Sequence, residues 1–371
     1  MDTSSSAFRL LSLIALSGEC GTEFLSYMGI SESYGEKLIT KLKDDNYIKS
    51  HYRDRLRGYR LTNRGKKLLL EINPDRFGFY LSGNSDTNRP RSDVPRRMRL
   101  QQTSIVYATL LNAGVTIFRD EKPLLFQPGN QKHCTLPLPV FYQSREIKEL
   151  GADAIKINNS RTIGVLFTEE CIYAVFYTGD SLMRWEYRTE LKVKTMIQYH
   201  ITRGILSKEY IHPWYHPDTP VKAMLIGKDM DTALKLLTST GGFQKSYFYL
   251  DTSFDYFHYL PSTPAGETLL KLLCSPKLRS DLRTLLLSDL QPPCPDYGLE
   301  HDATLDGIPV LLGFDFDMLR LSRYRTALSL QGLSGHLICF DFQKEVLAQF
   351  FGDLVTIETI DLEKFERRFL H

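Results

Sequence analysis

Cysteines and long hydrophobic runs are both scarce in this 371-residue chain. The six cysteines are scattered without a C-x-x-C pair, and a chain of this length does not need disulfides, so reduced thiols are expected. No run approaches the roughly 20 apolar residues of a membrane span, and no basic segment followed by a long apolar core opens the sequence. We therefore expect a cytoplasmic protein with no membrane partner.

Several enzyme signatures are missing as well. The sequence contains no G-x-x-x-x-G-K-[ST], no G-x-G-x-x-G and no G-x-S-x-G. These absences argue against a nucleotide-driven motor, a dinucleotide-dependent enzyme and a hydrolase with a nucleophile elbow. We predict no cofactor and no bound metal, and we find no internal repeat.

The strongest positive signal lies in residues 31–65. Ser33 and Glu36 have the S-x-x-E spacing of a capping box, which predicts that an amphipathic helix starts there. Apolar residues recur every four positions and predict one buried helix face. That face consists of Tyr34, Leu38 and Leu42, whereas Gly35, Lys37, Lys41 and Lys43 lie largely off it.

A two-stranded β-ribbon is predicted after this helix. Its strands span residues 47–52 and 58–62, and they flank a basic tip at 53–57 that contains Arg53, Arg55 and Arg57. Gly58 suits the turn out of that tip. A helix followed by a basic ribbon is the arrangement of a winged helix-turn-helix.

The run Tyr59–Gly65, which reads YRLTNRG, resembles the Y-x-L-T-x-x-G signature that closes the wing in many bacterial winged-helix proteins. The resemblance implies that Leu61 is a core residue and that Thr62 caps the next helix. Together with the helix and ribbon it predicts a winged helix-turn-helix domain over residues 1–75. Its other helices are expected at 8–17, 23–28 and 63–72.

Charge is distributed unevenly along the chain. Residues 1–99 hold 18 Lys and Arg against 12 Asp and Glu, a net of +6, whereas the remainder holds 28 against 32, a net of −4. Residues 76–99 read as a basic hinge or arm that includes Arg96 and Arg97. Such an arm either tracks a phosphate backbone or serves as a solubilising linker, and the sequence leaves both alternatives open.

Residues 100–371 alternate between strand-like and helix-like segments. This alternation predicts a mixed-sheet α/β domain with some antiparallel pairing, subdivided near 205–220, and an α/β or α+β fold class for the whole chain. The aromatic run 246–259 is acidic, so core packing or a protein interface explains it better than stacking on bases.

Three constellations were weighed as metal or catalytic sites. Asp153 and Asp180 followed by Glu190-Leu-Lys192 match the D…E-x-K pattern of a nuclease superfamily, but the surrounding residues favour a helix over the strand that this pattern needs. His212 and His216 are four residues apart, yet the prolines after each make a helical zinc site unlikely. Asp315 and Asp317 at a strand end favour a helix cap over a cation site.

The order of a winged helix, a hinge, a helix at 99–114 and an α/β domain resembles the replication-relaxation family of plasmid and conjugative-element proteins. The later segments 163–167, 172–179 and 185–192 are similar to proteins of such elements as well. The resemblance implies an accessory role in DNA relaxation, replication or conjugative transfer, with a C-terminal domain that is nuclease-like in fold but inactive. The partners it implies are a relaxase or a replication protein.

We therefore predict a non-enzymatic, sequence-specific protein that binds double-stranded DNA, with a second copy of the chain as a candidate partner in a homodimer. The alternatives are a transcriptional regulator whose second domain senses a ligand or dimerises, and a metal-dependent nuclease using Asp153, Glu190 and Lys192. The predicted DNA-contacting residues are Ser33, Tyr34, Lys37, Lys41, Lys43, Arg53, Arg55, Arg57, Arg60, Arg64, Arg96 and Arg97.

Overall fold

The structure is a computed structural model that describes residues 2–126, 136–150, 160–202, 215, 218–241 and 247–370. These residues form a mixed α/β protein with three sheets, as the sequence predicts at this level. Contacts divide the chain into two compact units, Met1–Leu124 and Leu125–His371. None of the helices in the described ranges is long and apolar enough to cross a membrane.

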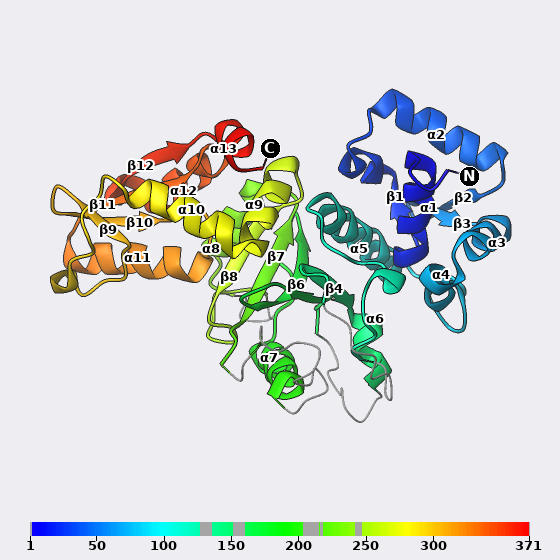
Figure 1. Cartoon of the computed structure of the whole chain (residues 1–371), viewed down its shortest axis with the longest axis horizontal. Coiled ribbons are helices and arrows are strands. Elements are labelled where there is room, and N and C mark those ends of the chain that lie inside the picture. The colour runs from blue at the N-terminus through cyan, green and yellow to red at the C-terminus, as the bar shows by residue number, and fades with distance from the viewer. Residues whose placement is uncertain are drawn as a thin grey trace. The chain divides into compact units, whose positions relative to one another are not determined.

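The first unit combines helices with a small antiparallel sheet whose strand order is β1-β3-β2 (Figure 1). A short 3₁₀ helix, η1, precedes the exposed helix α2. The elements in chain order are α1 (Ser6–Ser17), β1 (Cys20–Gly21), η1 (Thr22–Met28), α2 (Glu32–Asp44), β2 (Ile48–Arg53), β3 (Leu56–Leu61), α3 (Asn63–Ile72), α4 (Pro74–Leu81) and α5 (Val94–Asn112).

The junction between β3 and α3 follows the sequence prediction. Leu61 is buried, and the Thr62 hydroxyl accepts a hydrogen bond from the backbone N–H of Gly65 at 3.1 Å. This bond satisfies one of the free N–H groups at the start of α3, so that Thr62 is the N-cap. Gly65 is needed here because a Cβ atom would lie 2.2 Å from the carbonyl oxygen of Tyr47.

Helix α2 differs from its prediction in start and in face. It is capped at Ser31 and not at Ser33, and its cap side chain makes no hydrogen bond, so the predicted capping box is wrong. Tyr34 is half exposed and is therefore not part of the buried face. Gly35 takes the inner position instead, since a Cβ there would meet Leu25 at 2.8 Å. The buried residues follow the i, i+3, i+4, i+7 pattern as Gly35, Leu38, Ile39 and Leu42.

The β2–β3 hairpin has a tighter turn than the sequence indicates. Its two turn residues, Asp54 and Arg55, have φ values of 51° and 64°, the left-handed conformation that a two-residue type I′ turn requires. Gly58 is not a turn residue but lies inside β3, opposite Gly21 and His51. Its Cβ would lie 2.3 Å from Glu19 Oε1, so glycine leaves room for a buried carboxylate.

Residues 76–99 do not form a separate hinge or arm, and this prediction is wrong. They contain most of α4 and the start of α5, and both helices contact α1. The irregular segment between them is held by packing, since the Thr87 hydroxyl donates to the carbonyl of Ala15 at 2.8 Å and Ser85 is buried. The first unit therefore extends through α5 to Leu124, beyond the domain end predicted at residue 75.

The second unit contains a five-stranded sheet of order β4-β5-β6-β7-β8 and a four-stranded sheet of order β12-β11-β10-β9. Both are mixed, with parallel pairs β6–β7, β7–β8, β10–β11 and β11–β12 and antiparallel pairs at the other positions. The strands are β4 (Val140–Gln143), β5 (Gly164–Phe167), β6 (Ile172–Gly179), β7 (Val221–Gly227), β8 (Phe257–Pro261), β9 (Ala303–Leu305), β10 (Ile308–Leu312), β11 (Gly335–Phe340) and β12 (Val355–Ile360).

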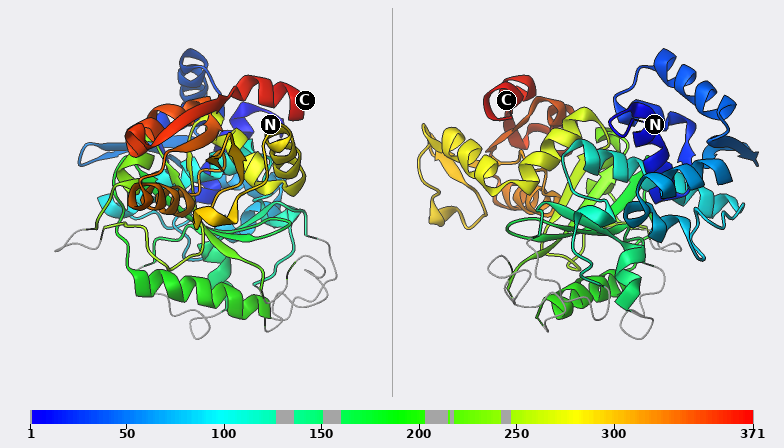
Figure 2. Two further views of the ribbon diagram at one scale, coloured as in Figure 1. Left: turned by 90° about the vertical axis from the view of Figure 1, so that its left-hand side faces the viewer. Right: turned by 45° about the vertical axis from the view of Figure 1, so that its right-hand side comes forward.

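Helices cover these sheets, and α7 and α9 lie on opposite sides of the five-stranded sheet (Figures 1 and 2). Asp317 caps α11 by accepting the N–H of Leu319 at 3.2 Å, which confirms the cap predicted there. The helices are α6 (Ser144–Ile147), α7 (Tyr187–Thr202), α8 (Met230–Leu237), α9 (Pro264–Cys274), α10 (Pro276–Leu287), α11 (Met318–Gln331), α12 (Lys344–Phe351) and α13 (Leu362–Phe369).

An aromatic cluster fills the core beside the five-stranded sheet. Trp185 is buried, and its ring lies 5.1 Å from Phe176 and 5.1 Å from Phe248 between centroids. Phe254 and Phe257 pack on the same cluster at 5.7 Å from each other. The aromatic run 246–259 thus serves core packing, one of the two roles predicted for it. The predicted subdivision near 205–220 lies largely outside the described residues.

Candidate nucleic-acid interface

The outward face of α2 carries polar and basic side chains. Ser33, Tyr34, Lys37 and Lys41 are all exposed, and their spacing of three and four residues places them on one stripe opposite the buried face. Lys43 is half buried and holds its ammonium group 5.3 Å from the Tyr59 ring centroid. The stripe offers to a partner one aromatic hydroxyl and the ammonium groups of Lys37 and Lys41, which pair with no carboxylate among the described residues.

The tip of the β2–β3 hairpin gathers three arginines. Arg53, Arg55 and Arg57 are all exposed, and the register pairs Arg53 with Leu56 and Arg57 with Tyr52 across the hairpin. Within the described ranges their one ion pair, Arg53 with Asp54 at 3.3 Å, is highly exposed and so contributes little. The tip therefore presents an excess of positive charge on a rigid turn.

Two of the predicted DNA-contacting residues, Arg60 and Arg97, are buried, and this part of the prediction is wrong. Arg60 Nε donates to Glu19 Oε2 at 2.6 Å, and Arg97 Nη2 donates to Glu19 Oε1 at 2.8 Å. Both guanidinium groups face the inside of the unit because Glu19, whose side chain is fully buried, needs cationic partners there. Neither is available to a phosphate.

Glu19 also connects these arginines to the hairpin backbone. Arg97 donates to the carbonyl oxygen of His51 at 2.9 Å, and Gln101, which donates to Glu19 at 2.7 Å, also donates to the carbonyl of Arg57 at 3.1 Å. Burial acts to raise the pKa of Glu19, but the hydrogen bonds from Arg97, Gln101 and Arg60 outweigh it and lower the pKa. Helix α5 thereby fixes both strands of the hairpin.

The remaining predicted residues are less free than those on the stripe and at the tip. Arg64 is exposed, and its guanidinium lies 5.3 Å from the Tyr47 ring centroid. Arg96 is half buried and pairs with Asp86 at 2.7 Å. Both stay candidates, although a contact by Arg96 would have to compete with that ion pair.

Sequence reasoning missed two exposed residues on β2. Tyr52 is 68% exposed, and Lys49 is exposed on the same strand. Alternation could not have indicated both, because the two residues are three apart on opposite faces of β2, where only Ile48 is buried. We add both residues to the candidate interface.

The residues of the nuclease pattern are not brought together. Glu190 is buried and Lys192 is exposed, and both lie on α7, where residues two apart point in different directions. Asp153 and the pair His212 and His216 lie outside the described residues. Within the described ranges, no group of three or more His, Cys, Asp or Glu side chains could hold a metal ion.

Glu190 gives the second unit a measurable pH dependence. Burial raises its pKa to about 7, although Ser160 donates to its carboxylate at 3.1 Å. A raised pKa means that the folded state holds a proton the unfolded chain has lost, so the free energy of unfolding is largest below about pH 4.5 and falls as the pH rises through 7. We expect a loss of up to about 3 kcal/mol between pH 5 and pH 8.

Urea unfolding followed by tryptophan fluorescence measures this loss, because Trp185 and Trp214 both belong to the second unit. The Glu190→Gln variant should lack this part of the pH dependence. Glu345→Gln, which changes an exposed glutamate on α12, should keep it. Equal pH dependence in wild type and Glu190→Gln would show that Glu190 does not titrate in this range.

Comparison with known proteins gives no relative for this chain: it matches no protein-family model, no curated protein and no solved structure.

Proposed function

We propose that the first unit is a winged helix-turn-helix that binds double-stranded DNA in a sequence-specific manner. In this proposal α2 enters the major groove and the β2–β3 hairpin is the wing. The element order supports it, since α1, η1 and α2 are followed directly by a hairpin with a basic tip. The single observation that carries the proposal is that five exposed cations, Lys37, Lys41, Arg53, Arg55 and Arg57, lie on α2 and at the hairpin tip, while Arg60 and Arg97 are used internally.

Lys37, Lys41, Arg53, Arg55 and Arg57 are the side chains proposed to neutralise phosphates. Ser33 and Tyr34 lie on the α2 stripe beside the lysines and are proposed to contact base edges. In this proposal Ser33 and Tyr34 read sequence, whereas the lysines of α2 and the arginines of the wing set affinity and orientation. This division of roles is expected for a short helix that fits the width of the major groove.

For the whole chain we propose a non-enzymatic accessory role in DNA relaxation, replication or transfer, with the second unit recruiting a relaxase or replication protein or a second copy of the chain. The separation of Glu190 and Lys192 on α7 favours this over a metal-dependent nuclease. The alternative is a transcriptional regulator whose second unit senses a ligand. A hollow on the surface of the second unit supports this alternative.

Fluorescence anisotropy of the full chain with labelled duplex tests the proposal. The duplexes would come from the DNA that flanks its own coding sequence, with a scrambled duplex as control, over a salt series. Five phosphate contacts predict a slope of log K against log[salt] of about −4.5. A specific site should bind about 10³-fold or more tightly than scrambled duplex. Weak, salt-independent binding to every duplex would contradict the proposal.

A further inference from the structure

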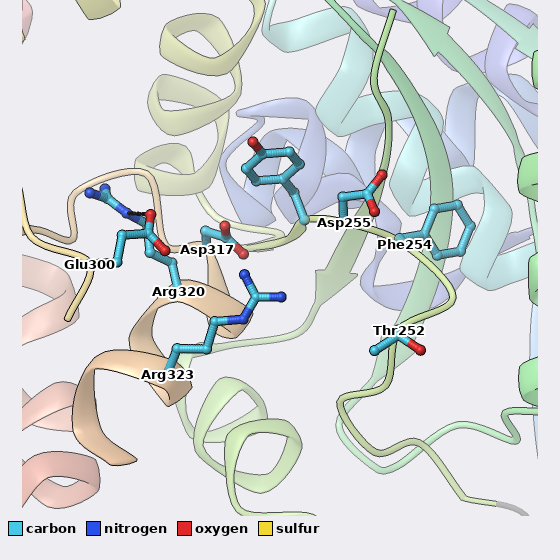
Figure 3. A pocket seen from close by; sticks show the side chains of 8 residues that line it. Thr252, Phe254, Asp255, Glu300, Asp317, Arg320 and Arg323 are labelled. Carbon is cyan, nitrogen blue, oxygen red and sulfur yellow. Dashed lines mark hydrogen bonds and ion pairs between the residues drawn. The ribbon is translucent and has the colours of Figure 1, made fainter. Parts of the chain in front are cut away.

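A hollow of about 270 Å³ opens on the surface of the second unit (Figure 3). One wall is the loop 252–256 that precedes β8, and the other is the first turns of α11 with Glu300 beside them. Two elements far apart in the sequence thus meet at this place. The described residues around the hollow show which of its charges already have partners.

The three acidic side chains of the hollow are all engaged. Asp255 pairs with Lys194 at 2.7 Å, and Glu300 pairs with Arg320 at 2.7 Å. Asp317 is buried and accepts the backbone N–H groups of Phe257 at 3.1 Å and of Leu319 at 3.2 Å. Asp255 and Glu300 are thus paired with cations, whereas Asp317 is held by backbone N–H groups.

The two arginines of the hollow differ from each other. Arg320 is held by Glu300 and by Asp302, each at 2.7 Å. Arg323, one turn further along α11, is exposed and forms no ion pair or hydrogen bond in the part of the chain that the structure describes. Figure 3 shows its guanidinium pointing into the hollow toward the 252–256 loop. Arg323 is therefore the cation of the hollow that pairs with no described carboxylate.

An aromatic ring stands beside this charge. Tyr256 is 40% exposed, and its ring is parallel to the buried His258 ring, with 11° between the planes and 6.3 Å between centroids. The Lys222 ammonium lies 4.5 Å from the Tyr256 ring centroid. These contacts cover part of the ring and hold it in place, and its exposed part remains for a ligand.

We propose that this hollow binds a small organic anion, whose carboxylate or phosphate group pairs with Arg323 and whose flat ring lies against Tyr256. A guanidinium binds either anion through two parallel hydrogen bonds. At about 30 Å³ per water molecule, the hollow has room for about nine waters, so the ligand has on the order of ten non-hydrogen atoms. The site lies wholly within the second unit and does not depend on the proposed DNA binding.

Isothermal titration calorimetry of the full chain with four probes at constant ionic strength tests the proposal. Benzoate and phenyl phosphate carry the ring and the charge and distinguish a carboxylate site from a phosphate site. Benzamide has the shape of benzoate without its charge, and inorganic phosphate has charge without a ring. We expect at least one of the first two to bind at least tenfold more tightly than either control.

Variants locate the site. Arg323→Gln should weaken the binding of that probe about tenfold or more. Arg325→Gln is a matched control, since it removes the same charge from the same helix, where Arg325 lies against Phe350 and does not line the hollow. Three results would each overturn the proposal. They are equal binding of benzoate and benzamide, unchanged binding in Arg323→Gln, and no binding of any probe at a concentration on the order of 10 mM. Arg323 is exposed and unpartnered, so its replacement should leave the fold intact.

Discussion

Replacing Arg53, Arg55 and Arg57 together with glutamine is expected to reduce the affinity for duplex DNA strongly and to flatten its salt dependence. Each phosphate contact that is lost lowers the slope of log K against log[salt] by about 0.9, so the triple variant should lose about 2.7 of the expected slope. At low salt this amounts to a loss of two or more orders of magnitude in affinity. The loss should be the same for specific and scrambled duplex, because backbone contacts carry no sequence information.

A charge-matched control separates the hairpin tip from a general effect of net charge. Glutamine at Lys277, Arg325 and Lys364 removes three exposed positive charges from the second unit. It changes the net charge from +2 to −1, as the hairpin triple does. The control should keep most of the wild-type slope. Anisotropy titrations at four or more salt concentrations measure both variants, and an unchanged slope in the hairpin triple would remove the wing from the interface.

Replacing Glu19 with alanine is expected to destabilise the first unit by about 3–5 kcal/mol. The change leaves the Arg60 and Arg97 guanidinium groups inside the unit without their shared anion, although the carbonyl oxygens of Arg91 and His51 still accept from them. Buried charges without a counter-ion are far more costly than the loss of an exposed pair. Because small domains are stable by only about 5–15 kcal/mol, much of this unit's stability depends on one carboxylate.

Hydrogen exchange measured by mass spectrometry tests this prediction, because the first unit contains no tryptophan and exchange resolves the two units separately. Amides of β1, β2, β3 and α5 should lose protection together in Glu19→Ala, while those of the second unit keep theirs. Glu36→Ala is the control, since it removes an exposed carboxylate from α2 and should change stability by no more than about 0.5 kcal/mol. If Glu19→Ala kept wild-type protection, the stability of the first unit would not depend on the Glu19 carboxylate that pairs with the two arginines.

Much of the local structure could be predicted from the sequence. Thr62 as an N-cap and α3 over residues 63–72 follow from short-range chemistry, in which a hydroxyl satisfies a free backbone N–H three residues ahead. The exposure of Lys37, Lys41 and the three tip arginines was predicted because charged side chains avoid burial unless they are paired.

Pairing is what the sequence could not reveal. Arg60 and Arg97 resemble their exposed neighbours in the sequence, and only the fold shows that Glu19, 41 and 78 residues away, holds them inside the unit. The sequence suggests a turn at Gly58. The position requires glycine because a Cβ atom there would meet the side chains of the distant Glu19 and Gln101. By itself the sequence determined α3, the two strands of the hairpin and the exposure of the cations on α2 and at the hairpin tip. Only the tertiary structure decided which charges are buried and paired in the protein interior, because such pairing depends on contacts between residues far apart in the chain.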